Sequence, residues 1–234
     1  MTKQFLFNRN PIQFGKTIEQ PSQDLIKSTP SLWNASLEDA LKYGGPLTRE
    51  AIGALNLKFD KKYIVVDTKV HMLMPNMIPA IPNWHTDGVP RRAGDQIGPE
   101  IKGQPDIFLQ EQMSDSRFHL LVTGEHCLTE FVNEVGAISL EVPSEPSTKL
   151  YSMVNEQTRE LVTNPDSPYS TMRAPSCTAV EFDWFTLHRG VKSTGHEWRF
   201  LIRVTETDHM QPQTNLRDII RTQIQVYTEA SFGW

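Results

Sequence analysis

Hydrophobic and polar residues alternate most regularly in one segment of the chain, residues 63–74. From Val66 onward, valine, threonine and methionine side chains fall on one face, while Asp67, Lys69 and His71 fall on the other. This period of two, with many β-branched residues, predicts a strand. Other apolar runs predict strands at residues 118–123, 129–138, 150–154, 179–187 and 198–205. Since turn residues separate these runs and helices do not alternate with them, we expect a mainly β, antiparallel sandwich or barrel.

Helical patterns occur only towards the two ends. Residues 1–35 are polar and contain prolines at 11, 21 and 30, which predicts an irregular arm. Ser36 and Asp39 form a capping-box pattern that opens a short helix ending near Tyr43. A second helix is expected to begin at Thr48, after Gly44-Gly45-Pro46 has ended the first. Leu216, Ile219 and Ile220 have helical spacing and predict a C-terminal helix, while residues 223–227 fit helix or strand.

Two long stretches have no clear periodicity. Residues 88–106 carry glycines, prolines and the pair Arg91-Arg92, and we predict a mobile loop that closes over a site as a lid. Residues 143–175 are polar and contain proline, apart from the strand expected at 150–154.

Composition indicates an ordinary globular domain of 234 residues, with 38% hydrophobic and 22% charged residues. We divide it into an N-terminal arm and helical buttress (1–60), a barrel (61–205) and a C-terminal extension (206–234). The net charge of −5 argues against a general nucleic-acid surface. Two cysteines, no signal-peptide pattern and no membrane-length apolar stretch predict a cytoplasmic protein. Phosphate-loop, dinucleotide, paired CxxC and GxSxG motifs are absent from the sequence.

The candidate chemistry lies in two short segments, Trp84 to Gly88 and Thr186 to Gly190. His85 and Asp87 are two residues apart, so in an extended segment both side chains leave the same face, roughly 6.6 Å apart. With His188 they would form a face of two imidazoles and one carboxylate, the ligand set of non-haem Fe(II) oxygenases. Trp84 and Trp184 flank the two segments.

The order His-x-Asp, a long gap, His and then an arginine resembles the 2-oxoglutarate- and Fe(II)-dependent dioxygenase superfamily, over residues 63–205. The resemblance implies a double-stranded β-helix, or jelly roll, with His85, Asp87 and His188 as iron ligands. It also implies that Arg199, eleven residues after His188, binds the distal carboxylate of 2-oxoglutarate. Arg203 lies four residues on, faces the same side of the strand and remains a rival.

On this resemblance, the chain would hydroxylate a C–H bond and release succinate and CO2, with ascorbate as an aid in vitro. We expect a small polar substrate, although a nucleobase or a peptide side chain also fits. Trp84, Trp184 and Arg91 are candidate substrate contacts; core packing for the tryptophans and a solvated loop for the arginine are the alternatives. A cupin-type metal isomerase or hydrolase, which would not need Arg199, and a non-catalytic binding module are alternative functions. The oligomeric state stays open.

Overall fold

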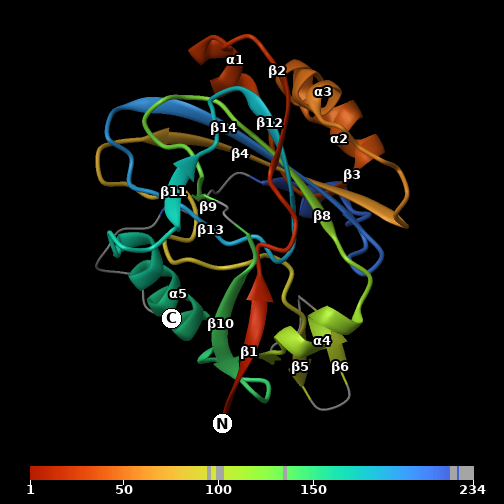
Figure 1. Cartoon of the computed structure of the whole chain (residues 1–234). Helices are drawn as coiled ribbons and strands as arrows, with labels where there is room; N and C mark the ends of the chain where they lie inside the picture. The colour runs from red at the N-terminus through yellow and green to blue at the C-terminus, as the bar shows by residue number, and fades with distance from the viewer. Residues whose placement is uncertain (94–95, 99–102, 134–135, 222–225, 227–234) are drawn as a thin grey trace.

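The computed structural model describes residues 1–93, 96–98, 103–133, 136–221 and 226, and the chain is mainly β with antiparallel pairing. The largest sheet has seven strands in the order β15-β3-β4-β14-β8-β12-β2 (Figure 1). Its central strands, β4 (Tyr63–Leu73) and β14 (Glu197–Thr207), pair along eleven residues each. The others are β2 (Gln13–Thr17), β3 (Ser31–Ser36), β8 (Arg117–Val122), β12 (Thr178–Asp183) and β15 (Ile220–Arg221).

Three smaller sheets complete the β structure. The one that bears on function has the order β11-β9-β13. A two-stranded sheet joins β1 to β10, and a three-stranded sheet joins β6, β5 and β7. Their strands are β1 (Thr2–Phe7), β5 (Arg91–Ala93), β6 (Gln96–Gly98), β7 (Gln104–Pro105), β9 (Glu130–Asn133), β10 (Ile138–Pro143), β11 (Ser170–Arg173) and β13 (His188–Arg189). Over the described residues, the sheets do not close into a barrel.

Helices cover the outer face of the large sheet near its N-terminal strands (Figure 1). Here α1 (Gln23–Ser28), α2 (Leu37–Tyr43) and α3 (Gly45–Ala54) bury Ile26, Leu47 and Ala51 against Phe200 and Val204. The opposite face of the sheet contributes to a second hydrophobic cluster, which also includes α4 (Ile107–Gln112) and α5 (Leu150–Thr163). The large sheet therefore separates two cores, because its strands alternate in the side chains that they present to each face.

The chain passes repeatedly between the large sheet and the small sheet of β9, β11 and β13. After β4, the segment at His85 forms an isolated bridge with His188 beside the small sheet. The chain then returns to the large sheet in β8, to the small sheet in β9, and again to the large sheet in β12. It ends this alternation with β13 and β14. Segments distant in sequence are thereby brought to one end of the paired sheets.

Several predicted elements are confirmed. The strands expected at 63–74, 118–123 and 198–205 correspond to β4, β8 and β14. Ser36 caps α2 by accepting a hydrogen bond from the backbone N–H of Asp39, as the capping pattern predicts. The next helix begins earlier than expected, at Gly45, because Pro46 occupies its first turn, where its missing N–H costs nothing.

The N-terminal arm was predicted wrongly. Residues 1–35 contain β1, β2, most of β3 and the helix α1. β1 pairs with β10 near the middle of the chain, and β2 pairs with β12. Local composition gave no indication of this, since edge strands gain their order from a partner that is far away in the sequence.

The strand expected at 150–154 is also wrong, since these residues begin α5. Leu150, Val154 and Thr158 are its buried residues, and their spacing of four is helical. Residues 150–154 contain only one interval of this spacing, so these five positions alone do not distinguish a helix from a strand.

Four other expectations need smaller corrections. The strand expected at 129–138 is divided between β9 and β10, and residues 134–135 lie outside the described part. The strand expected at 179–187 ends at Asp183, as β12, and the chain turns before β13. The loop at 88–106 contains β5, β6 and β7, and residues 94–95 and 99–102 are outside the description.

The C-terminal helix is short, α6 (Leu216–Ile219), and leads into β15. The expectation for 223–227 falls almost entirely outside the described residues.

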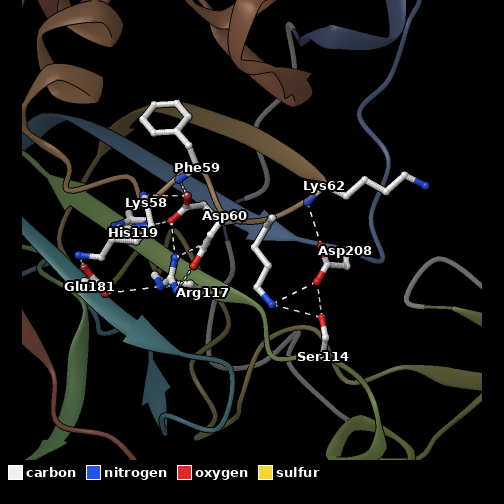
Figure 2. A network of polar contacts seen from close by, with 11 residues as sticks. Lys58, Phe59, Asp60, Lys62, Ser114, Arg117, His119, Glu181 and Asp208 are labelled. Atoms are coloured by element: carbon white, nitrogen blue, oxygen red, sulfur yellow. Dashed lines mark hydrogen bonds and ion pairs between the residues drawn. The ribbon is translucent and has the colours of Figure 1, made fainter.

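A polar network lies where β8, β12 and β14 meet the segment before β4 (Figure 2). Glu206, which is fully buried, accepts hydrogen bonds from Arg117, His119 and the backbone N–H groups of Lys58 and Phe59. Beside it, Asp208 accepts from Ser114, Lys61 and the backbone of Lys62. Every buried carboxylate oxygen of Glu206 thus has a partner, which is the condition for burying a charge.

No helix among the described residues has the length and apolar character needed to cross a membrane.

Candidate metal centre

The two histidines of the predicted site face each other across a short antiparallel bridge. The backbone N–H of His85 donates to the carbonyl of His188 at 3.1 Å, and the N–H of His188 donates back at 3.0 Å. Their imidazole centroids are 4.5 Å apart. This mutual pairing sets the spacing of the two rings, although their positions in the sequence differ by 103.

Asp87 completes the group that the sequence predicts. Its Oδ1 lies 3.9 Å from Nε2 of His85, and its Oδ2 lies 3.6 Å from Nε2 of His188. One ligand atom from each of the three residues lies within 4.8 Å of the other two. A metal ion about 2.0–2.2 Å from each atom would fit between them. The sequence therefore predicts this grouping correctly.

The second ring nitrogen of each histidine fixes which nitrogen is available to a metal. Nδ1 of His85 lies 2.7 Å from the carbonyl oxygen of Asn83, and Nδ1 of His188 lies 3.0 Å from that of Thr186. A carbonyl can only accept, so Nδ1 carries the hydrogen in both rings. Each Nε2 therefore has a free lone pair directed towards Asp87, as metal-binding histidines require.

Electrostatics favour the same protonation states. Burial and then the neighbouring His188 imidazole lower the pKa of His85 to about 4, so this ring is neutral at pH 7. Burial alone would raise the pKa of Asp87, but the Arg203 guanidinium and the two imidazoles outweigh burial and hold that pKa well below its usual range. A neutral imidazole beside an ionised carboxylate is what binding of a divalent cation needs.

The two candidate arginines have different surroundings. Arg203 donates from Nη1 to Asp87 at 2.8 Å and from Nη2 to Asp67 at 3.0 Å. Arg199 is 1% exposed and donates from Nε to the carbonyl of Cys127, while its Nη1 has no hydrogen-bond partner among the described residues. Arg203 thus orients a predicted metal ligand, and Arg199 retains a free buried donor.

A cavity of about 270 Å³ opens beside the triad. One part of its wall is charged and is formed by Lys69, Arg203 and Asp67. Another part is apolar and is formed by Trp33, Ile81 and Leu201. Gly190 also lines it, and a Cβ there would lie 2.8 Å from the carbonyl oxygen of Ala80, so the close approach of these two segments requires glycine. A pocket of mixed polarity beside convergent polar groups is typical of small-molecule sites.

The three candidate substrate contacts do not line this cavity. Trp84 and Trp184 are fully buried in the hydrophobic cluster, which agrees with their alternative role in core packing. Trp84 supports Arg189, whose guanidinium lies over its ring at 4.5 Å and is paired with Glu130. Arg91, in β5, donates to the carbonyl of Gly103, the residue before β7. No described residue of 88–106 lines the cavity either, so the structure does not place the predicted lid there.

Several residues of the site were not singled out from the sequence. Trp33 comes from the N-terminal region that had been expected to be an irregular arm. Asn155, on α5, accepts a hydrogen bond from the backbone N–H of Trp84 and so holds the segment that carries His85. Lys69 and Asp67 were placed on one face of a strand, but the alternation could not show that this face meets the histidines.

Comparisons with protein-family models, curated proteins and solved structures find no match to this chain. The geometry of the site is therefore the basis for proposing a function.

Proposed function

We propose that this protein is an Fe(II)- and 2-oxoglutarate-dependent dioxygenase that hydroxylates a small polar molecule. The observation that carries the proposal is the triad of His85, Asp87 and His188, with both Nε2 atoms free and the carboxylate ionised. Two imidazoles and one carboxylate on one side of an ion leave its remaining positions open for other ligands.

The arrangement of the sheets supports the same proposal. The sequence resemblance implies a double-stranded β-helix, with ligands delivered from strand ends that are distant in sequence. The chain alternates between the seven-stranded sheet and the sheet of β9, β11 and β13, and the ligands lie where β13 and the His85 segment meet. We therefore propose the double-stranded β-helix as the fold.

A bound iron would supply activation of O2, the oxidant; one oxygen atom would enter succinate, with loss of CO2 from 2-oxoglutarate, and the other would enter the hydroxylated product. His85, Asp87 and His188 would hold the metal, and Arg203 would keep the Asp87 carboxylate oriented. We assign the distal carboxylate of 2-oxoglutarate to Arg199, because its buried Nη1 has no partner among the described residues and an unpaired buried donor is costly. Arg199 is not among the residues that line the cavity, so the co-substrate would have to reach it beyond the cavity wall. Trp33, Ile81 and Leu201 would exclude water from the space beside the metal.

A reducing, cytoplasmic setting is part of the proposal, and the free, buried thiols of Cys127 and Cys177 are compatible with it.

Turnover of the co-substrate tests the proposal. Protein incubated with Fe(II), ascorbate, oxygen and 2-oxoglutarate is expected to form succinate, faster when a cell extract supplies the substrate. Mass gains of one oxygen in the extract would identify the product. His188→Ala should abolish both changes, and His196→Ala, at an exposed position, should leave them intact.

Metal binding without binding of 2-oxoglutarate would instead favour a cupin-type enzyme. Absence of metal binding would favour a binding module.

A further inference from the structure

The cavity beside the triad contains one basic side chain that the proposed chemistry leaves unused. Three cationic residues line it: Lys69, Arg189 and Arg203. Arg189 is paired with Glu130, and Arg203 is paired with Asp67 and Asp87. The ammonium of Lys69 has no hydrogen bond or ion pair with any residue in the described part of the chain. A half-buried charge without a counter-ion is unfavourable, so it marks a place where a ligand can supply one.

No carboxylate in the described part of the chain makes an ion pair with the Lys69 ammonium. Its cross-strand partner in β14 is Leu201, which lies between Arg199 and Arg203 on the same face. Asp67 also lines the cavity, but its oxygens accept from Arg203 and from the backbone N–H of Asn34. Burial, together with repulsion from Arg203, lowers the pKa of Lys69. Asp67 and Asp87 attract the Lys69 ammonium, but burial and repulsion from Arg203 and Arg199 outweigh this attraction.

The balance of charge leaves Lys69 uncompensated even after the proposed ligands bind. The metal would bring two positive charges, and Asp87 and the two carboxylates of 2-oxoglutarate would bring three negative ones. Asp67 offsets Arg203. Arg199 and Lys69 then remain as two positive charges. The metal and its three carboxylates together leave one negative charge, which can neutralise only one of them. Since Arg199 has a free donor suited to the co-substrate, Lys69 is the cation in excess.

We infer that the substrate of this enzyme carries an oxyanion group, a carboxylate or a phosphate, that pairs with Lys69. This inference rests on the proposed function and specifies its substrate class. The remainder of the substrate would lie along the apolar wall formed by Trp33, Ile81 and Leu201. Lys69 would act as a specificity-determining residue, since it would attract acids and leave neutral analogues unpaired.

Binding of small probes tests the inference without the natural substrate. Protein loaded with Zn(II) and 2-oxoglutarate is titrated with propionate, methyl phosphate and the neutral propionamide, and binding is followed by ligand-observed NMR. We expect one of the two anions to bind more tightly than propionamide. Preference for propionate would indicate a carboxylate substrate, and preference for methyl phosphate a phosphorylated one.

Variants of Lys69 separate a specific contact with the anion from the effect of the protein's overall charge. Lys69→Met should weaken binding of the preferred anion by about tenfold or more, as expected for loss of a charge-assisted contact. Lys69→Arg should retain binding. Lys16→Met, at an exposed position of β2, is the matched control and should bind like the wild type. Unchanged anion binding in Lys69→Met would overturn the inference.

The co-substrate provides a second, independent readout. Affinity for 2-oxoglutarate should stay within about twofold of the wild type in Lys69→Met, since Arg199 is the proposed partner. A large loss would assign Lys69 to the co-substrate and overturn the inference. If the wild type does not bind 2-oxoglutarate, the proposed function fails. The anion titration of metal-free wild type and Lys69→Met would then still decide whether Lys69 binds an oxyanion.

Discussion

At the residue scale, the site depends on which side-chain nitrogens remain free once the others have formed hydrogen bonds within the protein. Both histidines donate from Nδ1 to a carbonyl two residues earlier in the chain, Asn83 for His85 and Thr186 for His188. This shared local arrangement leaves both Nε2 atoms available. The same reasoning distinguishes Arg199, with one free donor, from Arg203, whose terminal nitrogens both contact carboxylates.

Replacement of a ligand should remove the metal and leave the fold largely intact. His85→Ala or His188→Ala should lower bound iron from about one ion per chain to nearly none, because a single imidazole and a carboxylate seldom hold a divalent ion against competing water. Asp87→Ala should weaken binding less completely. Metal analysis after gel filtration, with circular dichroism to check folding, measures this. Undiminished iron in His85→Ala would disprove the assignment.

The two arginines should affect different ligands. Arg199→Ala is expected to weaken binding of 2-oxoglutarate by roughly 30- to 150-fold, with little change in metal affinity. Arg203→Ala should instead weaken metal binding, since it orients Asp87 and stabilises its ionised form. Anaerobic calorimetric titrations of metal and of 2-oxoglutarate would compare them. A greater loss of 2-oxoglutarate affinity in Arg203→Ala would exchange the two roles.

At the scale of elements, α5 supports the segment that carries two of the three ligands. Asn155 accepts the backbone N–H of Trp84 at 2.9 Å, next to His85. A buried N–H without a partner is costly, so the helix and the ligand segment stabilise each other. The apolar run at 150–154 predicts a short strand, and so gives no indication of this connection.

Loss of this hydrogen bond should weaken metal binding at the proposed site. Asn155→Ala is expected to reduce metal affinity about tenfold, as changes behind metal ligands commonly do. It should also lower the free energy of unfolding by about 1–2 kcal/mol. Metal titration and chemical denaturation of the variant measure the two effects. Glu156→Ala, at the exposed neighbouring position of α5, is the control, and equal behaviour of both variants would exclude a positioning role for Asn155.

At the scale of the whole molecule, a buried network joins the strands that frame the site. Glu206 connects β14 to β8 through Arg117 and His119, and to the segment before β4 through two backbone N–H groups (Figure 2). Burial alone would raise the pKa of Glu206, but these donors outweigh it and lower the pKa to about 2. The ionised carboxylate is therefore part of the folded state.

Because of this network, the free energy of unfolding should depend on pH in the acidic range. A carboxylate with a lowered pKa stabilises the fold fully above its unfolded value, about 4.5, and loses that contribution as the pH falls towards 2. Glu206→Gln should lower the free energy of unfolding at pH 7 by roughly 3–5 kcal/mol, since it breaks a buried charged network. The variant should also lose less stability than the wild type between pH 4.5 and 2. Denaturation curves across this range test it, and parallel pH profiles would contradict it.

The sequence by itself determined the residues of the candidate metal site and the main strands that flank them. Alternation in 63–74 fixed which side chains share a face of β4, because strand geometry is local and has a period of two. The two-residue spacing of His85 and Asp87 likewise placed them together. Folding brought His188 to them, as the resemblance predicted.

Tertiary structure decided what lies around that group. Trp84 and Trp184 pack in the hydrophobic core and do not line the cavity, and pairing with two carboxylates distinguishes Arg203 from Arg199. The strands β1 and β2 and the contact of Asn155 depend on partners more than seventy residues away. Such partners are chosen by packing and hydrogen bonding between distant segments, which no local pattern of hydrophobic and polar residues encodes.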